Sequence, residues 1–479
     1  MSSRAYIRVC AGALLQEHAP IKNFYRQLHT EFTILYYNIS MDKKINVGLV
    51  SLGCAKNLVD SENLLGMLRD RGYEIVSDPA EAEIIFVNTC GFIEPAKQES
   101  IDTIFEMAEY KQTGRLKKLF VTGCLAQRYG EALAAEIPEV DGFMGVADYA
   151  RLYDMLDEAM GGSRPMYMQD GPRFFDCGRV LTTVPFSAYV KISDGCDNKC
   201  TYCAIPLIRG GYASRPFEDI VAECRRLAGE GVTEITLIAQ DTSRYGCDFG
   251  DGHYLLPELL QEISKIEGIH WLRVLYCYPD STDDRLLDEI ANNPKVAPYL
   301  DLPLQHINDD MLRKMNRRGS SDWIRSRIAE CKKRGITLRT TMIVGFPGET
   351  AGQFEELCSF IKDAQFDRLG AFAYSPEEGT AAAIMPDQID EDEKYARLDQ
   401  LMMLQQAVSM ELMEKRIGTE CEVLVEGQDE DGWYGRSILE APESDGCIHL
   451  IADRELVPGE YVMARITDAD AYDLTAEVL

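Results

Sequence analysis

Three cysteines form a close group near the middle of the chain, inside the run KISDGCDNKCTYC. Cys196, Cys200 and Cys203 have the spacing C-x3-C-x2-C. Three thiolates can hold three irons of a cubane iron–sulfur cluster, which normally takes four cysteines. The fourth iron is then open to a substrate. The spacing therefore predicts a [4Fe-4S] cluster with one reactive iron.

An open iron beside a reductant is an arrangement in which S-adenosylmethionine is cleaved, and this cysteine spacing is the radical-SAM signature. Zinc, or three structural thiols, is the alternative interpretation. Zinc sites usually contain two C-x2-C pairs or histidines at short spacing, and neither lies near these cysteines. We therefore expect a cluster and S-adenosylmethionine here.

A second set of cysteines follows three apolar strands in the first third of the chain. Cys54 ends INVGLVSLGC, Cys90 ends AEIIFVNTC and Cys124 ends KKLFVTGC, and a helical stretch follows each. Alternating strands and helices predict a parallel sheet, whose ligands gather beyond the carboxyl ends of the strands. The three cysteines should therefore converge, which predicts a second cubane cluster. The alternative is that they fill strand ends as small apolar side chains.

The central region has six apolar strands with helices between them, which predicts a partial (β/α)6 barrel with its chemistry at the C-terminal strand ends. Gly345 and Gly348 follow the fifth strand and would let a flat ligand such as adenine approach the backbone. Tyr202, between two cysteines, could pack on adenine or shield the cluster. Gln305 follows the fourth strand and is a further cofactor-binding candidate, whereas its neighbour His306 is expected to be structural.

The last part of the chain predicts a small antiparallel β-barrel, because five short strands are separated by turns. Barrels of this oligonucleotide-binding type usually bind nucleic acid through basic grooves. Residues 417–479, however, contain sixteen acidic residues against three arginines. Such a surface repels phosphates and attracts a basic protein. Direct nucleic-acid binding is therefore not expected.

The bulk composition fits a large multidomain enzyme. The chain has 479 residues, is 46% hydrophobic and carries a net charge of −30, so it can bury substantial cores. No apolar run reaches the roughly eighteen residues of a membrane span. Fifteen scattered cysteines fit a reducing cytoplasm better than a disulfide scaffold. Residues 1–44 match no motif and are expected to be a disordered extension or the product of an upstream start codon.

Residues 45–479 resemble the methylthiotransferases. The resemblance rests on SLGCAKNLVDSE, VNTCGFIEPAKQES, VTGC, SDGCDNKCTYCAIPLIRGGYASRP, LDLPLQHIND and VGFPGET. It implies an α/β multidomain fold: an N-terminal parallel-sheet domain over residues 45–160, a radical-SAM partial barrel over 182–410 and a C-terminal TRAM barrel over 415–479. It also implies two [4Fe-4S] clusters, an auxiliary one on Cys54, Cys90 and Cys124 and a second, the SAM cluster, on Cys196, Cys200 and Cys203.

The resemblance is greatest to the branch that adds a methylthio group to the β-carbon of an aspartate in small-subunit ribosomal protein 12. The tRNA-modifying branch usually shows TFGC with a Gln-Met-Asn run where this chain has SLGCAKN. The implied chemistry is radical removal of hydrogen from that carbon and transfer of methylated sulfur from the auxiliary cluster. A flavodoxin or ferredoxin would donate electrons. A tRNA methylthiotransferase, and a non-catalytic iron–sulfur protein for electron transfer or cluster delivery, are the alternatives.

Overall fold

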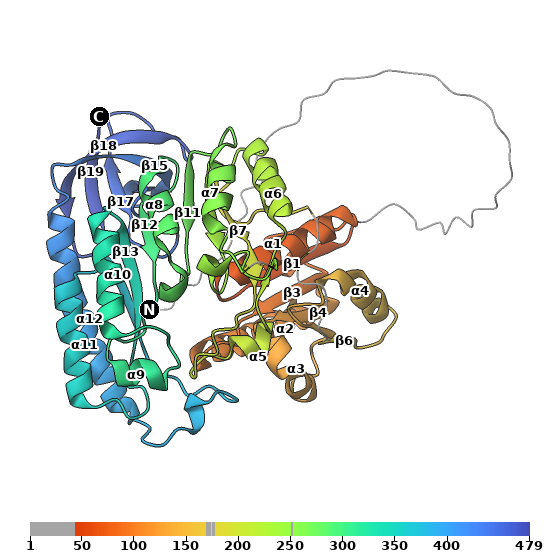
Figure 1. The fold of residues 1–479 in the computed structure, drawn as a ribbon. Coiled ribbons are helices and arrows are strands. Elements are labelled where there is room, and N and C mark those ends of the chain that lie inside the picture. The colour runs from red at the N-terminus through yellow and green to blue at the C-terminus, as the bar shows by residue number, and fades with distance from the viewer. Residues whose placement is uncertain (1–43, 169–173, 175–177, 251) are drawn as a thin grey trace.

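The computed structural model describes residues 44–168, 174, 178–250 and 252–479. The extension predicted over residues 1–44 thus lies, except for Lys44, outside the described residues. The described chain forms a parallel α/β sheet domain, a partial barrel and a small closed barrel in sequence order (Figure 1). The predicted fold class is confirmed. No helix within the described ranges is long and apolar enough to cross a membrane.

The N-terminal domain is a six-stranded, all-parallel sheet with the strand order β2-β1-β3-β4-β5-β6. Strand β3 is buried on both faces. Ile85 and Val87 pack with α2 and α3 on one face, and Ile84 and Phe86 pack with α1 and α4 on the other. The strands are β1 (Asn46–Ser51), β2 (Glu74–Ile75), β3 (Ile84–Thr89), β4 (Lys118–Gly123), β5 (Gly142–Met144) and β6 (Met166–Tyr167). The helices are α1 (Ala55–Asp70), α2 (Glu94–Thr113), α3 (Cys124–Glu136) and α4 (Leu152–Met160).

The central domain contains six parallel strands in two three-stranded sheets, β7-β10-β11 and β12-β13-β14. A parallel bridge joins Leu272 of β11 to Val296, three residues before β12, and so connects the two sheets. The six strands predicted from sequence are therefore the six of the partial barrel. They are β7 (Ser187–Lys191), β10 (Glu234–Ile238), β11 (Trp271–Val274), β12 (Tyr299–Asp301), β13 (Thr337–Val344) and β14 (Arg368–Ala373).

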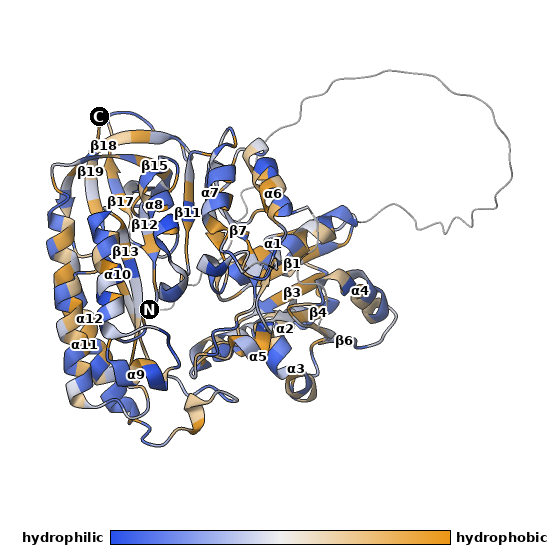
Figure 2. Ribbon diagram, in the orientation of Figure 1, coloured by the Kyte–Doolittle hydropathy of each residue, from blue (hydrophilic) through white to orange (hydrophobic). Residues whose placement is uncertain are grey.

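Helices surround the barrel and, except α5, which packs on Cys124 and Val146 of the N-terminal domain, share one large apolar core with its strands. In Figure 2, hydrophilic and hydrophobic residues mix along α10, α11 and α12, as expected for helices with one face on a core and another in solvent. The helices are α5 (Ile205–Arg209), α6 (Phe217–Gly229), α7 (Leu256–Ser264), α8 (Asp284–Asn292), α9 (Asp309–Lys314), α10 (Ser321–Lys333), α11 (Ala351–Ala364) and α12 (Glu391–Glu414).

Short elements complete the connections between these helices and strands. An antiparallel pair, β8 (Ser193–Asp194) and β9 (Ala213–Ser214), lies on either side of the cysteine loop in the chain. The 3₁₀ turns are η1 (Pro79–Glu81), η2 (Tyr149–Arg151), η3 (Thr242–Arg244), η4 (Pro279–Ser281) and η5 (Ala382–Ile384).

The C-terminal domain is a closed five-stranded barrel with the strand order β15-β16-β17-β19-β18. Its strands pair antiparallel except β17 with β19. Closure removes the exposed sheet edges that such short strands would otherwise present. The strands are β15 (Glu420–Asp429), β16 (Gly432–Ser437), β17 (Ile448–Ile451), β18 (Tyr461–Ala469) and β19 (Leu474–Val478).

A buried ion pair fastens this small barrel to the central domain. Arg436 of β16 donates to both carboxylate oxygens of Glu234 on β10, at 2.6 and 3.2 Å. Glu234 is completely buried and also lies 3.4 Å from Arg273. Burial alone would raise the pKa of Glu234, but Arg436 and Arg273 hold it at about 2. The Glu234–Arg436 pair is therefore ionised, and each buried charge is stabilised by the other.

Residues from all three domains also meet in one apolar cluster. Tyr189 and Tyr299 of the central barrel pack there with Val59 of α1 and Ala441 from the segment after β16. The Tyr299 hydroxyl donates to Asp445 at 2.7 Å. Hydrophobic contact and hydrogen bonding thus join the C-terminal barrel to the interior of the central one.

We predict that the Glu234→Gln variant lowers the free energy of unfolding by about 3–5 kcal/mol, since it leaves buried Arg273 without its counter-charge and leaves Arg436 only Glu426. The Glu420→Gln control removes an exposed pair with Arg465 and should cost less than about 1 kcal/mol. Urea denaturation followed by tryptophan fluorescence measures both.

The same pair sets a pH dependence with a definite sign. Because the pKa of Glu234 is lowered from 4.5 to about 2, its stabilisation is present above pH 4.5 and is lost as the pH falls toward 2. Equal acid sensitivity in the wild type and the Glu234→Gln variant would contradict this account.

Candidate active site between two cysteine triads

The first triad, Cys54, Cys90 and Cys124, is called the auxiliary triad here. Each member follows a strand of the N-terminal sheet: Cys54 caps α1 after β1, Cys90 directly follows β3, and Cys124 begins α3 after β4. Because β1, β3 and β4 are parallel neighbours, their carboxyl ends meet at one edge. The auxiliary triad therefore forms at the place that the strand pattern predicts.

Glycines let the three strand ends approach one another. Gly53 has φ +94°, and a Cβ there would lie 2.9 Å from the Cβ of Cys90. Gly123 has φ +95°, and a Cβ there would lie 2.2 Å from Oδ1 of Asn88. A side chain at either position would push the cysteines apart. The close approach is thus built into the residues that precede Cys54 and Cys124.

Electrostatics also show that the three thiols are close enough to interact. Burial, together with repulsion from the other two cysteines, raises the pKa of the Cys90 thiol to about 12. Burial raises the pKa of Cys124 as well, against the opposing pull of Arg209. Three neighbouring cysteines are a donor set suited to a cationic iron centre, since iron would bind all three as thiolates.

The second triad, Cys196, Cys200 and Cys203, is called the central triad here. It lies on the loop between β8 and α5, just past the first barrel strand. Burial raises the pKa of Cys196 to about 11 and of Cys203 to about 12. Repulsion from Cys200 contributes to both shifts. The loop therefore brings its three thiols together in the same way.

Neighbouring side chains hold the central triad in place. The amide of Asn198 donates to Sγ of Cys196 at 3.4 Å, and Tyr278 contacts Sγ of Cys200 at 3.4 Å. Arg317 lies 4.0 Å from the same sulfur and stacks on the Tyr278 ring. Tyr278 follows β11, so the loop is anchored to the C-terminal edge of the barrel.

Within the described residues, no group of three or more cysteine, histidine, aspartate or glutamate side chains is close enough to hold a metal ion. A cubane cluster places its own iron and sulfide atoms between its ligands, so its cysteines lie farther apart than the ligands of one ion. Both triads fit such a cluster by donor type and convergence.

A buried network of charges connects the two triads. Arg209, at the end of α5, donates to Asp60 of α1 at 3.0 Å and to Asp194 of β8 at 3.1 Å. It also reaches Sγ of Cys124 at 3.7 Å. Lys191 of β7 bridges the same two carboxylates at 2.5 and 3.0 Å. Asp194 lies two residues before Cys196, so this network spans the domain boundary between the triads.

A second cross-domain contact involves Glu377, in the loop after β14. Its buried carboxylate receives hydrogen bonds from Lys97 at 3.1 Å and Arg128 at 2.9 Å, both from the N-terminal domain. Arg128 also donates to the carbonyl of Gly91, next to Cys90. The last barrel strand is therefore fastened to the auxiliary triad's side of the N-terminal domain.

The structure gives the four predicted cofactor-binding residues distinct surroundings. Tyr202 packs against a cluster that contains Phe346 and Tyr374. Gln305 has φ +73° and its backbone pairs with β13 through Thr341 and Ile343. These two residues therefore border the strand ends around the central triad. Their role toward S-adenosylmethionine stays a prediction.

Gly345 has a packing reason that sequence analysis did not supply, and its predicted role toward adenine, like that of Gly348, stays a prediction. Both have positive φ, +70° and +71°. A Cβ at Gly345 would lie 2.3 Å from the side chain of Lys394 on α12. His306 is buried, accepts from the Asn308 amide and contacts Glu349 at 3.0 Å. Both of its ring nitrogens are thus used, as expected of a structural histidine.

Sequence analysis missed the charged residues of this site. Asp194 and Lys191 lie within five residues of Cys196 in the chain, and a lysine in an otherwise apolar strand is unusual enough to have indicated a partner. Arg209 and Asp60 are separated by 149 residues. Their pairing depends on how two domains dock, which no local pattern records.

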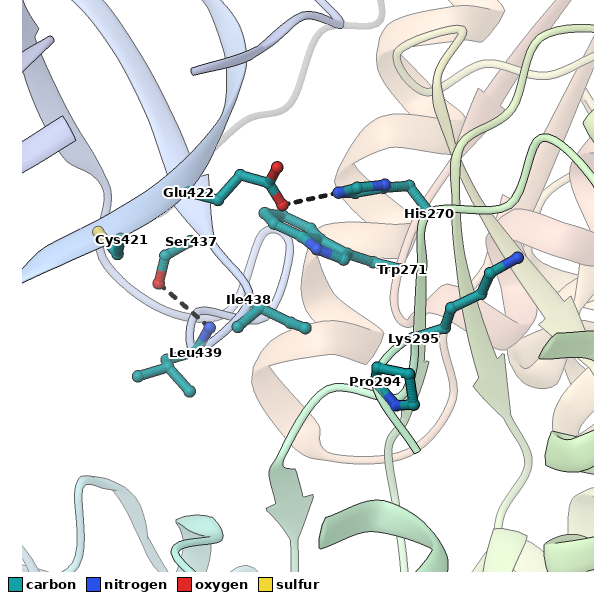
Figure 3. A pocket seen from close by; sticks show the side chains of 9 residues that line it. All are labelled: His270, Trp271, Pro294, Lys295, Cys421, Glu422, Ser437, Ile438 and Leu439. Atoms are coloured by element: carbon teal, nitrogen blue, oxygen red, sulfur yellow. Dashed lines mark hydrogen bonds and ion pairs between the residues drawn. The ribbon is translucent and has the colours of Figure 1, made fainter. Parts of the chain in front are cut away.

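A separate pocket of about 390 Å³ lies between β11 and the C-terminal barrel (Figure 3). Trp271 forms part of its wall, and His270 contacts Glu422 at 2.6 Å across the domain boundary. Its remaining lining residues are Pro294, Lys295, Cys421, Ser437, Ile438 and Leu439. None of the predicted site residues lines it, so it is no part of the candidate active site.

Comparison with known proteins assigns the chain to a family. Three family models match: uncharacterized protein family UPF0004 over residues 46–145, the radical SAM superfamily over 190–361 and the TRAM domain over 417–479. The ribosomal protein uS12 methylthiotransferase RimO of Clostridium acetobutylicum is 48% identical over 439 residues, which cover 91% of this chain and 98% of the relative. The chain belongs to the RimO methylthiotransferase family.

A second RimO relative, from Caldicellulosiruptor saccharolyticus, is 47% identical over 91% of this chain and 100% of its own length. Among solved structures, the radical S-adenosylmethionine methyltransferase TsrM from Kitasatospora setae aligns with a TM-score of 0.52 and 15% identity, over 71% of this chain and 74% of that one. This likeness concerns the fold alone. The predicted resemblance to the methylthiotransferases, and to their ribosomal-protein branch, is confirmed.

The predicted enzyme class is confirmed with the family. Membership of the radical SAM superfamily brings S-adenosylmethionine and a [4Fe-4S] cluster as cofactors. The non-catalytic alternative, electron transfer or cluster delivery, does not agree with membership of the RimO methylthiotransferases.

We predict that replacing Arg209 by methionine destabilises the protein by about 3–5 kcal/mol, because Asp60 and Asp194 lose a buried cationic partner. It should also change the absorption and electron paramagnetic resonance spectra of iron bound at the auxiliary triad, since the cation nearest to Cys124 is gone. The matched control is Arg226→Met, which removes an exposed pair with Glu230 and should alter neither. Unchanged spectra and stability in Arg209→Met would contradict the coupling role.

Proposed function

We propose that this protein is a radical S-adenosylmethionine methylthiotransferase that modifies the β-carbon of an aspartate in ribosomal protein uS12. The observation that carries the proposal is the pair of cysteine triads, which come from different domains and are held together by one buried charge network. A single triad would suffice for radical chemistry alone. The second provides a place from which sulfur can be transferred.

In this proposal the two triads have different tasks. Cys196, Cys200 and Cys203 would hold the cluster that binds S-adenosylmethionine. The auxiliary triad would hold a second [4Fe-4S] cluster, again with one iron free of cysteine. When bound, these cofactors supply the one-electron chemistry and the methyl and sulfur groups that no side chain offers.

The chain's own residues would position and protect that chemistry. Arg209 and Lys191 fix the auxiliary triad relative to the loop that bears Cys196, so the distance between the two centres does not drift. Glu377 clamps the opposite side through Lys97 and Arg128. Tyr278 and Arg317 contact the half-buried Cys200 and would shield that sulfur from water on their side.

The acidic C-terminal barrel is proposed to recognise the basic ribosomal protein. The structure reduces the number of acidic side chains that are free to do so, because several of the sixteen are paired with other residues of this chain. Glu426 accepts from Arg436 at 2.7 Å, and Glu422 contacts His270. The β15–β16 hairpin, by contrast, exposes Asp429, Glu430 and Asp431. These three form the patch that we assign to uS12.

We also propose an electron donor and a cellular compartment for the enzyme. A flavodoxin or ferredoxin would deliver electrons, and the ribosomal substrate would place the enzyme in the cytoplasm. A role on tRNA is disfavoured because the exposed hairpin is anionic and would repel the phosphate backbone.

We predict two separate clusters in each chain. After anaerobic reconstitution, the variant with Cys196, Cys200 and Cys203 all replaced by alanine should keep about half of the iron and sulfide, as should the corresponding auxiliary variant. The control is Cys331→Ala, a buried cysteine of the barrel core, which should keep all of it. If the central-triad variant holds no cluster, the auxiliary triad does not bind one by itself.

We predict that the reconstituted protein, given S-adenosylmethionine and a reductant, adds a methylthio group to purified uS12 and none to tRNA, as measured by mass spectrometry. Reversing the hairpin charges with Asp429→Lys, Glu430→Lys and Asp431→Lys should weaken uS12 binding about tenfold or more at low salt. The effect should shrink as salt rises, since exposed charges are screened within about 8 Å at physiological ionic strength.

A matched control separates local charge from net charge. Asp322→Lys, Glu355→Lys and Asp363→Lys change the same number of exposed acids on α10 and α11 and should leave uS12 binding nearly unchanged. Methylthiolation of tRNA without any of uS12 would overturn the proposed function. Equal loss in both triple variants would show that the hairpin has no special role.

A further inference from the structure

Lys56 is a buried cation beside the auxiliary triad that the mechanism above does not use. It lies two residues after Cys54, in the first turn of α1, and is only 6% exposed. Its Nζ lies over the ring of Tyr276, 2.9 Å from the ring centre. Among the residues that the structure describes, no carboxylate or other hydrogen-bond acceptor pairs with that nitrogen. A buried ammonium without a partner is costly, and a cation–π contact offsets only part of that cost.

No carboxylate of the described residues makes an ion pair with Lys56, although Oδ1 of the buried Asp301 has no hydrogen-bond partner of its own. Asp60 and Asp194 receive Lys191 and Arg209. Asp301 accepts from the backbone amide of Tyr276 at 3.0 Å and lies 3.9 Å from Arg339. The protein therefore supplies Lys56 with neighbours of opposite charge but with no direct ion pair. An incoming anion would complete it.

The start of α1 adds to this preference for an anion. The helix has sixteen residues, no acidic residue in its first turn and no side-chain hydrogen bond from its capping residue Cys54. The backbone N–H groups of such a turn carry partial positive charge. Helix N-termini of this kind bind carboxylates and phosphates readily. The unpaired Lys56 and the uncapped first turn thus favour the same kind of ligand.

Tyr276 places this anion site between the two triads. It follows β11 and has φ +64°, a conformation rare for a residue with a side chain. Its ring covers Lys56, while Tyr278, two residues further along, contacts Cys200 of the central triad. One short segment therefore reaches from the auxiliary side to the central triad. Backbone strain of this kind is retained where the surrounding structure requires it, often at functional sites.

We propose that Lys56, together with the N-terminus of α1, binds the carboxylate of the aspartate that is modified. This inference rests on the proposed function and names a specificity-determining residue for it. The carboxylate is bonded directly to the β-carbon, so holding the carboxylate fixes the reacting carbon to within one bond. The site would also distinguish aspartate from asparagine, which has the same shape but no charge.

The test compares uS12 with a uS12 variant in which the target aspartate is replaced by asparagine. Wild-type enzyme, reconstituted with both clusters, should bind the aspartate form about tenfold or more tightly. Lys56→Met, which keeps the length but not the charge, should bind both forms equally weakly. Lys56→Arg should restore most of the preference. The control Lys44→Met removes an exposed lysine of the same domain and should behave as wild type.

Separate readouts identify each outcome. Iron and sulfide contents should be the same in wild type and Lys56→Met, whereas the cluster spectra should shift, as in Arg209→Met, because a cation beside Cys54 is gone. If Lys56→Met keeps the preference for aspartate, Lys56 serves only the auxiliary cluster and the inference is wrong. The inference also fails if wild-type enzyme binds both uS12 forms equally. If wild-type enzyme binds uS12 but never methylthiolates it, the proposed function fails instead.

Discussion

The pairing of Arg209 and Lys191 with Asp60 and Asp194 is the interaction on which the rest of the site depends. All four side chains are nearly inaccessible to solvent, and they come from both the N-terminal and the central domains. Buried charges are tolerated only when their partners are in place. These four charges therefore find their partners only when the two domains are correctly docked. The separation of the cysteine triads is thus fixed by the same contact that makes docking favourable.

Much of the architecture follows from local sequence pattern. Apolar runs that end at Cys54, Cys90 and Cys124 predict a parallel sheet, and a parallel sheet brings its strand ends to one edge. The six barrel strands and the five strands of the terminal barrel are equally apparent, because each is a short apolar segment between turns. What these features share is that hydrophobic periodicity and turn residues act within about ten positions along the chain.

Other parts of the site could not be predicted in that way. Glu426 and Glu422 look like free surface acids in sequence. In the structure Glu426 pairs with Arg436, and Glu422 contacts His270. The side chain of Lys394, from a later helix, packs on Gly345, and the sequence around Gly345 does not reveal this contact. The partner in each case is set by tertiary packing, which overrides local preference. Such pairings become visible only when the domains are seen together.

The Glu234–Arg436 pair has a consequence for how such enzymes can change their targets over evolutionary time. The C-terminal barrel supplies a buried counter-charge, Arg436, to the catalytic domain. It therefore cannot be exchanged freely for another barrel. Replacing it with a foreign barrel would leave the buried Glu234 with Arg273 as its remaining counter-charge, unless an arginine arrived at the position of Arg436. New targets are therefore more accessible through changes in the outer loops of a fixed barrel than through recombination of whole modules.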